Sequence, residues 1–161
     1  MGFKTALLAA AIAVASTGRV HAAPLETDSQ ILSHYLVAGK QVEHVAGLNP
    51  VFQQTLVALF AAMPSEIRDN VQILSGYRSP ERQAELFAAA VRKYGSVKAA
   101  RRMVAPPGKS QHQRGMAVDL TFGSKAAKRW MHENVSAFGL RFPMSWEDWH
   151  LELATARADR K

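Results

Sequence analysis

Apolar side chains recur every three or four positions in three segments of the chain, and this spacing predicts three helices that each bury one face. Two segments begin at Asn49-Pro50 and Ser79-Pro80, where a polar N-cap precedes a proline that the first helical turn accepts. Gly95 and Gly139 follow the last apolar positions of two segments and are typical of helix C-caps. The predicted long helices span residues 50–63, 80–94 and 124–138, and shorter helices are expected after Asp28-Ser29 and over residues 96–103. The second long helix is expected to bury Leu86, Phe87, Ala90, Val91 and Tyr94.

Apolar and polar residues alternate in two further segments, Met116–Thr121 and Trp149–Leu153, as they do in a strand with one buried face. The positions expected on the core face are Met116, Val118, Leu120, Leu151 and Leu153. Asp119, His150 and Glu152 would then project from the opposite face.

Two shorter apolar runs, residues 71–74 and 140–142, also predict strands. Strands and helices are interspersed without the regular βαβ alternation of a doubly wound sheet. The sequence therefore predicts an α+β fold, with a small, mainly antiparallel sheet and flanking helices. We expect this domain to cover residues 48–155, after a lead-in segment over residues 23–47 and before a C-terminal tail over residues 156–161.

The N-terminal residues do not fit this pattern. Lys4 supplies a positive charge, Thr5–Ser16 is an apolar, alanine-rich run, and Val20-His21-Ala22 resembles a signal-peptidase site. These features predict a secretory signal peptide over residues 1–22, and therefore a secreted or periplasmic protein of the cell envelope. The run is too short to span a bilayer comfortably, and no other stretch is apolar enough to do so. A retained membrane anchor is the alternative.

Composition narrows the chemistry that the domain can perform. The chain has no cysteine, which excludes disulfides, thiolate metal sites and cysteine nucleophiles. Its formal net charge of +7 favours an acidic partner: nucleic acid, an anionic membrane or a cell-wall polymer. The charge alone does not choose among them, and a basic surface with no specific role would give the same value.

A metal site is indicated by the segment Ser110–Asp119 and by a second histidine further along the chain. His112, Asp119 and His150 supply two imidazoles and one carboxylate, which are typical ligands of an open zinc site. Glu147, three residues before the second histidine, would remain free to act as a base toward water at the open position. Each residue alone would more often be structural, so it is their combination that predicts the site. Iron oxygenases use the same ligand types, so the metal is not fixed by them.

Arg78 is the candidate for stabilising the developing charge. It lies at the end of a predicted strand, beside a turn, where a cation could stabilise the oxyanion that forms when water attacks an amide. A surface salt bridge is the alternative for this residue.

Two other patterns fall short of known motifs. Gly108-Lys109-Ser110 resembles the end of a phosphate-binding loop, but Met103 occupies the position of the required first glycine. His132-Glu133 begins like the helical zinc-protease motif, but Ser136 replaces its second histidine. We therefore expect His132 to be a helix-surface residue.

Three segments resemble the zinc D-Ala-D-Ala carboxypeptidase family, which includes VanY-type carboxypeptidases, D,D-dipeptidases and L-alanyl-D-glutamate endolysins. They are Ser75-Gly76-Tyr77-Arg78-Ser79, the Ser-x-His-x-x-Gly-x-Ala-x-Asp motif at residues 110–119, and Glu147-Asp148-Trp149-His150. Their order and rough spacing also match, and the resemblance covers about residues 50–153. It implies the hedgehog-like fold of the zinc D,D-peptidases.

The resemblance also implies roles for individual residues. The positions that match the family's ligands to a single zinc ion are His112, Asp119 and His150. Glu147 would be the general base, and Arg78 would stabilise the substrate carbonyl in the transition state. Ser110 and Gln83 fall where the family often has substrate-contacting or site-supporting polar groups. The alternatives are that Ser110 is a turn residue and that Gln83 is a helix-surface residue.

The substrates implied by the resemblance are the stem peptides of peptidoglycan, with no nucleic acid as partner. Predicted export and a basic surface agree with an acidic wall polymer. Hydrolysis of D-Ala-D-Ala is the first expectation, and cleavage within the stem, including L-Ala-D-Glu, is the second. The connections after Asp119 and between Phe142 and Trp146 are short, so no particular substrate transfers. A non-catalytic, zinc-stabilised module that binds wall peptides is the alternative class, but the filled base and arginine positions argue against it.

Overall fold

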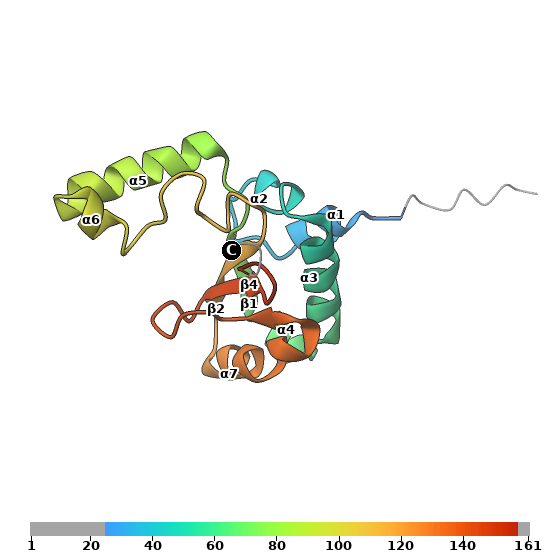
Figure 1. Cartoon of the computed structure of the whole chain (residues 1–161). Coiled ribbons are helices and arrows are strands. Elements are labelled where there is room, and N and C mark those ends of the chain that lie inside the picture. Colours follow the sequence, from blue (N-terminus) through green and yellow to red (C-terminus); the bar gives the residue numbers. More distant parts are fainter. Residues whose placement is uncertain (1–24, 158–161) are drawn as a thin grey trace, which may run out of the picture.

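A four-stranded sheet forms the centre of the molecule in the computed structural model, which describes residues 25–157 (Figure 1). Its strands are β1 (Val71–Ser75), β2 (Ala117–Phe122), β3 (Leu140–Arg141) and β4 (His150–Leu153). They lie in the order β1-β2-β4-β3, and each neighbouring pair is antiparallel. One isolated parallel bridge joins Leu36 to Ile73. The predicted α+β fold with a small, mainly antiparallel sheet is confirmed.

The described residues also form helices α1 to α7. They are α1 (Asp28–Ser33), α2 (Glu43–Ala46), α3 (Pro50–Ala62), α4 (Ser65–Arg68), α5 (Pro80–Tyr94), α6 (Val97–Ala100) and α7 (Lys125–Asn134), which continues into the 3-10 helix η1 (Val135–Phe138). Both proline-led helices begin where predicted, because Asn49 and Ser79 accept hydrogen bonds from backbone N–H groups of the first turn. The predicted cap of α1 is wrong. Thr27 caps this helix instead of Asp28 or Ser29, because its side chain and that of Gln30 form a reciprocal capping box.

The third long helix is shorter than predicted as a regular α-helix. Its last turn tightens into η1, and Gly139 then ends it in the left-handed region at φ 70°. Such tighter turns are a common way to satisfy the backbone groups at a helix end.

The hydrophobic core lies between the sheet and helices α1, α3 and α7. Its buried members include Phe52, Leu56, Leu59 and Phe60 of α3, Ile73, Val118, Leu120 and Leu151 of the sheet, and Ala127 and Met131 of α7. Leu32 and Val45, from the predicted lead-in segment, are fully buried in the same core. The backbone N–H of Ile73 donates to the carbonyl of Tyr35 at 2.7 Å, which joins this segment to β1.

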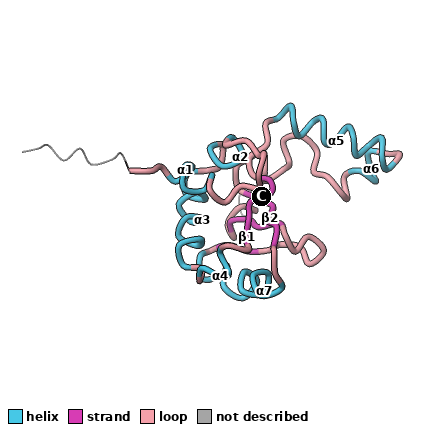
Figure 2. The backbone as a smooth tube through the Cα atoms, turned by 180° about the vertical axis from the view of Figure 1, so that it is seen from behind, coloured by secondary structure: helices cyan, strands magenta, loops and turns pink. Residues whose placement is uncertain are grey.

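Helices α5 and α6 and the return loop over residues 101–109 form an arm that extends away from the sheet (Figures 1 and 2). The predicted buried face of α5 is therefore only partly correct: its buried residues are Gln83 and Ala90, and Tyr94 is 38% exposed. The apolar stripe of α5 packs in the arm and has no contact with the central core cluster. Within the arm, the side-chain Nε2 of Gln83 donates to the carbonyl of Ala105 at 2.7 Å and so joins α5 to the return loop.

Within residues 25–157, no helix combines the length and the apolar character that a membrane span needs. The predicted signal peptide, residues 1–22, lies outside the described residues, and so do residues 158–161 of the predicted tail.

Candidate metal centre and its pocket

The pairing of β2 with β4 places Asp119 directly opposite His150. The Oδ1 atom of Asp119 lies 2.9 Å from Nδ1 of His150 and 3.3 Å from Nε2 of His112. The two histidine nitrogens are themselves 3.3 Å apart, and both rings are buried. Within the described part of the chain, no other set of three histidine, cysteine or acidic side chains converges in this way. The structure thus brings the three predicted ligands together.

Two glycines near His112 lie in close backbone contacts with the segment that precedes α3. The carbonyl of Gly76 accepts a hydrogen bond from Nδ1 of His112 at 2.8 Å, which directs Nε2 toward Asp119. A Cβ atom on Gly76 would lie only 2.0 Å from the carbonyl oxygen of His44. Gly115 adopts φ 67°, and a Cβ there would lie 2.7 Å from the carbonyl oxygen of Gly47. These contacts explain why the two motifs contain glycine at these positions.

Arg78 extends from the turn after β1 and binds the other oxygen of Asp119. Its Nη2 donates to Oδ2 at 2.7 Å, and its Nε donates to Oγ of Ser75 at 3.2 Å. Burial opposes ionisation of Asp119, but the hydrogen bonds to His112 and His150 and the charge of Arg78 hold its pKa well below the ordinary value. Asp119 therefore presents one oxygen to the histidines and keeps the other on the guanidinium.

Glu152 and Arg157 belong to the site but were assigned no role in the sequence analysis. Glu152 is completely buried, and its Oε1 accepts a hydrogen bond from Nε2 of His150 at 3.0 Å. Nε and Nη2 of Arg157 donate to its two oxygens, each at 2.8 Å. The one available signal was the alternation of β4, which places Glu152 on the same face as His150. The sequence analysis placed Glu152 on the face opposite the core, but its side chain is buried there, opposite Ala117 in the register and against Arg157.

The two histidines have different proton affinities in the metal-free protein. Burial lowers the pKa of His112. Burial also disfavours the charged form of His150, but its hydrogen bonds to Asp119 and Glu152 dominate and raise its pKa to about 9. A metal ion that takes the Nδ1 position of His150 near neutral pH would therefore displace a proton.

Glu147 lies on the loop between β3 and β4, which α7 holds in place. Lys128 forms an ion pair with Asp148, and Nε2–H of the exposed His132 donates to the Asp148 carbonyl at 3.0 Å. The prediction that His132 is a helix-surface residue is confirmed. Glu147 lines the same cavity as the ligand triangle, and its carboxylate makes no hydrogen bond to any residue between 25 and 157. Glu147 is thus positioned beside the ligand triangle but is not hydrogen-bonded to its residues.

The ligand triangle lines a cavity of about 500 Å³ between the end of the sheet and the arm. Ser110 and Gln83 also line this cavity, and both are almost fully buried. Gln83 supports the wall through its bond to Ala105, so it is no helix-surface residue. The hydroxyl of Ser110 makes no hydrogen bond within residues 25–157, which leaves it available to a bound molecule.

The donor set fits a zinc ion. Zinc bonds of about 2.0–2.1 Å to nitrogen and oxygen in a tetrahedron place ligand atoms about 3.3 Å apart. The three sides of the observed triangle measure 2.9, 3.3 and 3.3 Å. Each ligand is also fixed from behind by Gly76, Glu152 or Arg78, as is usual for zinc-binding imidazoles and carboxylates.

A mixed fold with three such ligands, an accessible cavity and a free carboxylate is typical of a metal-dependent peptidase. Comparison with known families agrees with this class. Residues 46–155 match the family model described as VanY, D-alanyl-D-alanine carboxypeptidase. Because the match covers more than half of the chain, the chain belongs to the VanY family.

Two curated relatives support the assignment. The chain is 35% identical to YodJ of Bacillus subtilis (strain 168), named as a carboxypeptidase, over 53% of this chain and 38% of YodJ. It is 33% identical to the D-alanyl-D-alanine carboxypeptidase of Enterococcus faecalis (strain ATCC 700802 / V583), over 55% of this chain and 42% of that protein. The matched part thus spans about two fifths of the length of these relatives.

Solved structures show the same fold. The LdcB LD-carboxypeptidase, described with the molecular basis of peptidoglycan recognition, has a TM-score of 0.61 at 26% identity, covering 78% of this chain and 67% of that one. VanYB in complex with D-Alanine-D-Alanine has a TM-score of 0.55 at 30% identity, with coverages of 69% and 74%. A VanY D,D-pentapeptidase with a glutamate-to-alanine substitution, in complex with Zn(II), has a TM-score of 0.54 at 29% identity, with coverages of 69% and 76%.

Proposed function

We propose that the chain is a zinc-dependent D-Ala-D-Ala carboxypeptidase that acts on peptidoglycan stem peptides in the cell envelope. One observation carries this proposal. A preformed triangle of His112, Asp119 and His150 lies beside the free carboxylate of Glu147 in a single cavity. The family match and the D-Ala-D-Ala bound to VanYB support the choice of substrate. The predicted signal peptide supports export.

The protein contributes binding, orientation and proton transfer to this reaction. A bound zinc ion supplies Lewis acidity and lowers the pKa of water toward about 7. His112, Asp119 and His150 hold the ion, and Glu147 accepts the proton of the attacking water. The same carboxylate then delivers that proton to the departing D-alanine amine, so that its charge is restored at the end of the cycle.

Arg78 has two roles in this proposal. Its bond to Oδ2 orients Asp119, and its remaining N–H groups stabilise negative charge on the carbonyl oxygen as water attacks. The unpaired hydroxyl of Ser110 contacts the substrate. Gln83 acts indirectly, because it holds the return loop of the arm against α5.

The direct test is hydrolysis of a stem pentapeptide by the zinc-loaded protein lacking residues 1–22, with products identified by mass. We expect the pentapeptide to lose one alanine, and we expect no cleavage when a chelator is present. The likeness to the LdcB LD-carboxypeptidase favours a second candidate, removal of the last alanine from a tetrapeptide, so the tetrapeptide is assayed beside the pentapeptide.

The other outcomes separate the remaining hypotheses. A cut at L-Ala-D-Glu would keep the proposed chemistry and move the specificity to an endopeptidase. Stoichiometric zinc with no cut in any peptide would contradict the enzyme and leave a wall-binding module.

Replacing Glu152 with glutamine should weaken zinc binding without removing a ligand. The substitution keeps the size of the side chain but removes the negative charge that fixes the ring of His150. Loss of such outer partners typically costs about 10–100-fold in metal affinity, so we expect the zinc dissociation constant to rise by about tenfold or more. Competition with a chromophoric chelator measures it. Glu133→Gln, on the exposed surface of α7, is the matched control, and equal affinities in the two variants would rule out this role for Glu152.

A further inference from the structure

One segment of this chain carries several basic residues and no acidic ones. Residues 86–118 contain no aspartate or glutamate, although the chain has 13 acidic residues in total. The basic residues of the same segment are Arg92, Lys93, Lys98, Arg101, Arg102, Lys109 and Arg114. This segment includes most of α5, all of α6 and the return loop, which form the arm seen in Figure 1. The arm therefore carries a net positive charge.

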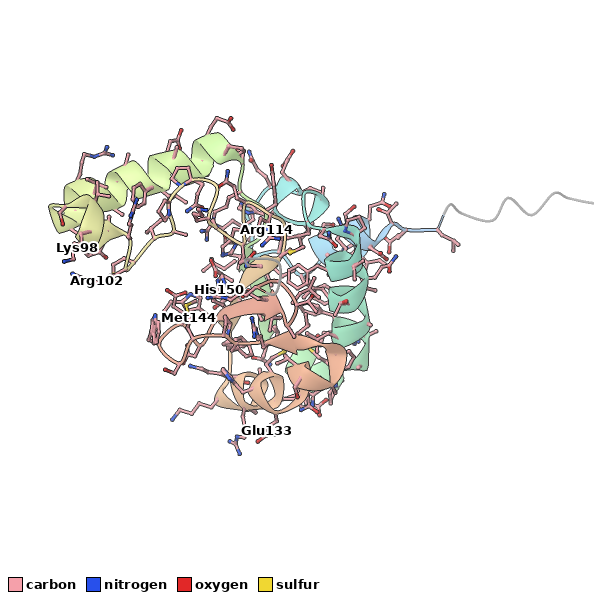
Figure 3. All side chains as sticks on the ribbon, in the orientation of Figure 1. Lys98, Arg102, Arg114, Glu133, Met144 and His150 are labelled. Carbon is pink, nitrogen blue, oxygen red and sulfur yellow. The ribbon has the colours of Figure 1, made fainter. Side chains whose placement is uncertain are left out.

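Three of these cations line the catalytic cavity. Arg101, Arg102 and Lys109, together named the basic wall, form part of its lining on the arm side, and Met144 belongs to the lining on the opposite loop. Figure 3 shows Arg102 toward the outer part of the arm, with Met144 and His150 nearer the sheet. The basic wall therefore lies on the approach to the metal centre.

The cations of the cavity differ in their partners. Arg78 and Arg157, at the metal centre, are paired with the buried carboxylates of Asp119 and Glu152. The three residues of the basic wall are exposed, and none of them forms an ion pair with a residue between 25 and 157. The charge at the centre is thus compensated by the protein itself, whereas the charge of the basic wall is compensated only by solvent or by a bound anion.

We propose that the basic wall binds a carboxylate of the peptide substrate at a residue before the scissile bond, which makes acidic stem peptides the preferred substrates. This inference rests on the proposed function. Guanidinium groups suit carboxylates because they can donate two parallel hydrogen bonds. An extended peptide advances about 3.3–3.6 Å per residue, so a glutamate three positions before the cut lies about 10 Å away from it. A cavity of about 500 Å³ suits a short peptide of this kind better than a wide polymer.

The test uses two pentapeptides that differ only in the glutamate residue, which carries a free carboxylate in one and a carboxamide in the other. For the zinc-loaded protein we expect kcat/KM to be about five- to tenfold higher for the acidic peptide, since two exposed ion pairs each contribute a few-fold. The preference should appear in KM and should decrease with salt. In Arg101→Ala/Arg102→Ala the ratio should fall to about 1, and in Arg102→Glu the amide should be preferred.

Arg92→Ala/Lys93→Ala is the matched control, because it removes two adjacent cations of α5 that do not line the cavity. This control should keep the wild-type ratio. Equal rates for the two peptides in the wild type, or an equal loss of preference in both double variants, would overturn the inference while leaving the carboxypeptidase intact. Inhibition by an anionic phosphate polymer, without any preference between the peptides, would also overturn it.

Binding separates this inference from the proposed function. Trp149 lines the cavity, so its fluorescence reports peptide binding whether or not cleavage occurs. Tighter binding of the acidic peptide with no hydrolysis would contradict the carboxypeptidase and support the basic wall.

Discussion

Replacing Glu147 with glutamine should leave zinc bound at one ion per chain and lower kcat by about 10²–10⁴-fold, which is the usual contribution of a positioned acid–base group. Glutamine has nearly the same shape as glutamate but cannot accept and return a proton. The Glu147 side chain makes no hydrogen bond within residues 25–157, and it is no member of the ligand triangle. Stability and metal content should therefore stay close to those of the unmodified protein, and the loss should be confined to turnover.

The measurement combines single-turnover hydrolysis of the pentapeptide with zinc analysis of the same preparation. Glu133→Gln provides the matched control, because it makes the same glutamate-to-glutamine change at an exposed position of α7 outside the cavity. Wild-type turnover in a zinc-replete Glu147→Gln protein would contradict the assignment of the base. A loss of zinc would instead show that Glu147 helps to hold the metal.

The ligand triangle could be predicted because its residue types and spacings are tied to local structure. The alternation of β2 and β4 placed Asp119 and His150 on one face, and antiparallel pairing then brought them opposite each other. The glycines of the two motifs mark close backbone contacts, and Gly115 also marks a positive φ. Such features are local, and they can be recognised without the rest of the fold.

The features that the sequence did not predict depend on long-range packing. Glu152 has the sequence context of an exposed strand residue, and only the C-terminal turn with Arg157 makes it a buried partner of His150. The apolar stripe of α5 has the same spacing as that of a core helix, yet α5 packs in an arm away from the core. The spacing of apolar residues shows that a face is covered, but it does not show which element covers it.

Replacing His150 with alanine should strongly weaken zinc binding and, with it, hydrolysis. Loss of an outer partner such as Glu152 typically weakens metal binding by about 10–100-fold. Because His150→Ala removes one of the three ligands themselves, we expect a larger rise in the zinc dissociation constant. Isothermal titration with zinc measures the affinity, and the pentapeptide assay measures the activity. His34→Ala is the matched control, because His34 is an exposed histidine of the N-terminal part, paired only with Glu26. Unchanged zinc affinity in His150→Ala would contradict the proposed metal centre.

The same substitution should also have a pH-dependent cost in the metal-free protein. The pKa of His150 is raised from its ordinary value of 6.5 to about 9, because the hydrogen bonds to Asp119 and Glu152 outweigh the effect of burial. A group whose pKa is higher in the folded state stabilises that state fully below its unfolded pKa, and this contribution is lost as the pH rises through the folded value. The difference in unfolding free energy between the unmodified protein and His150→Ala, measured with chelator present, should therefore be largest below about pH 6.5 and shrink toward pH 9. A difference that stays constant over this range would show that the imidazole carries no proton between the two carboxylates.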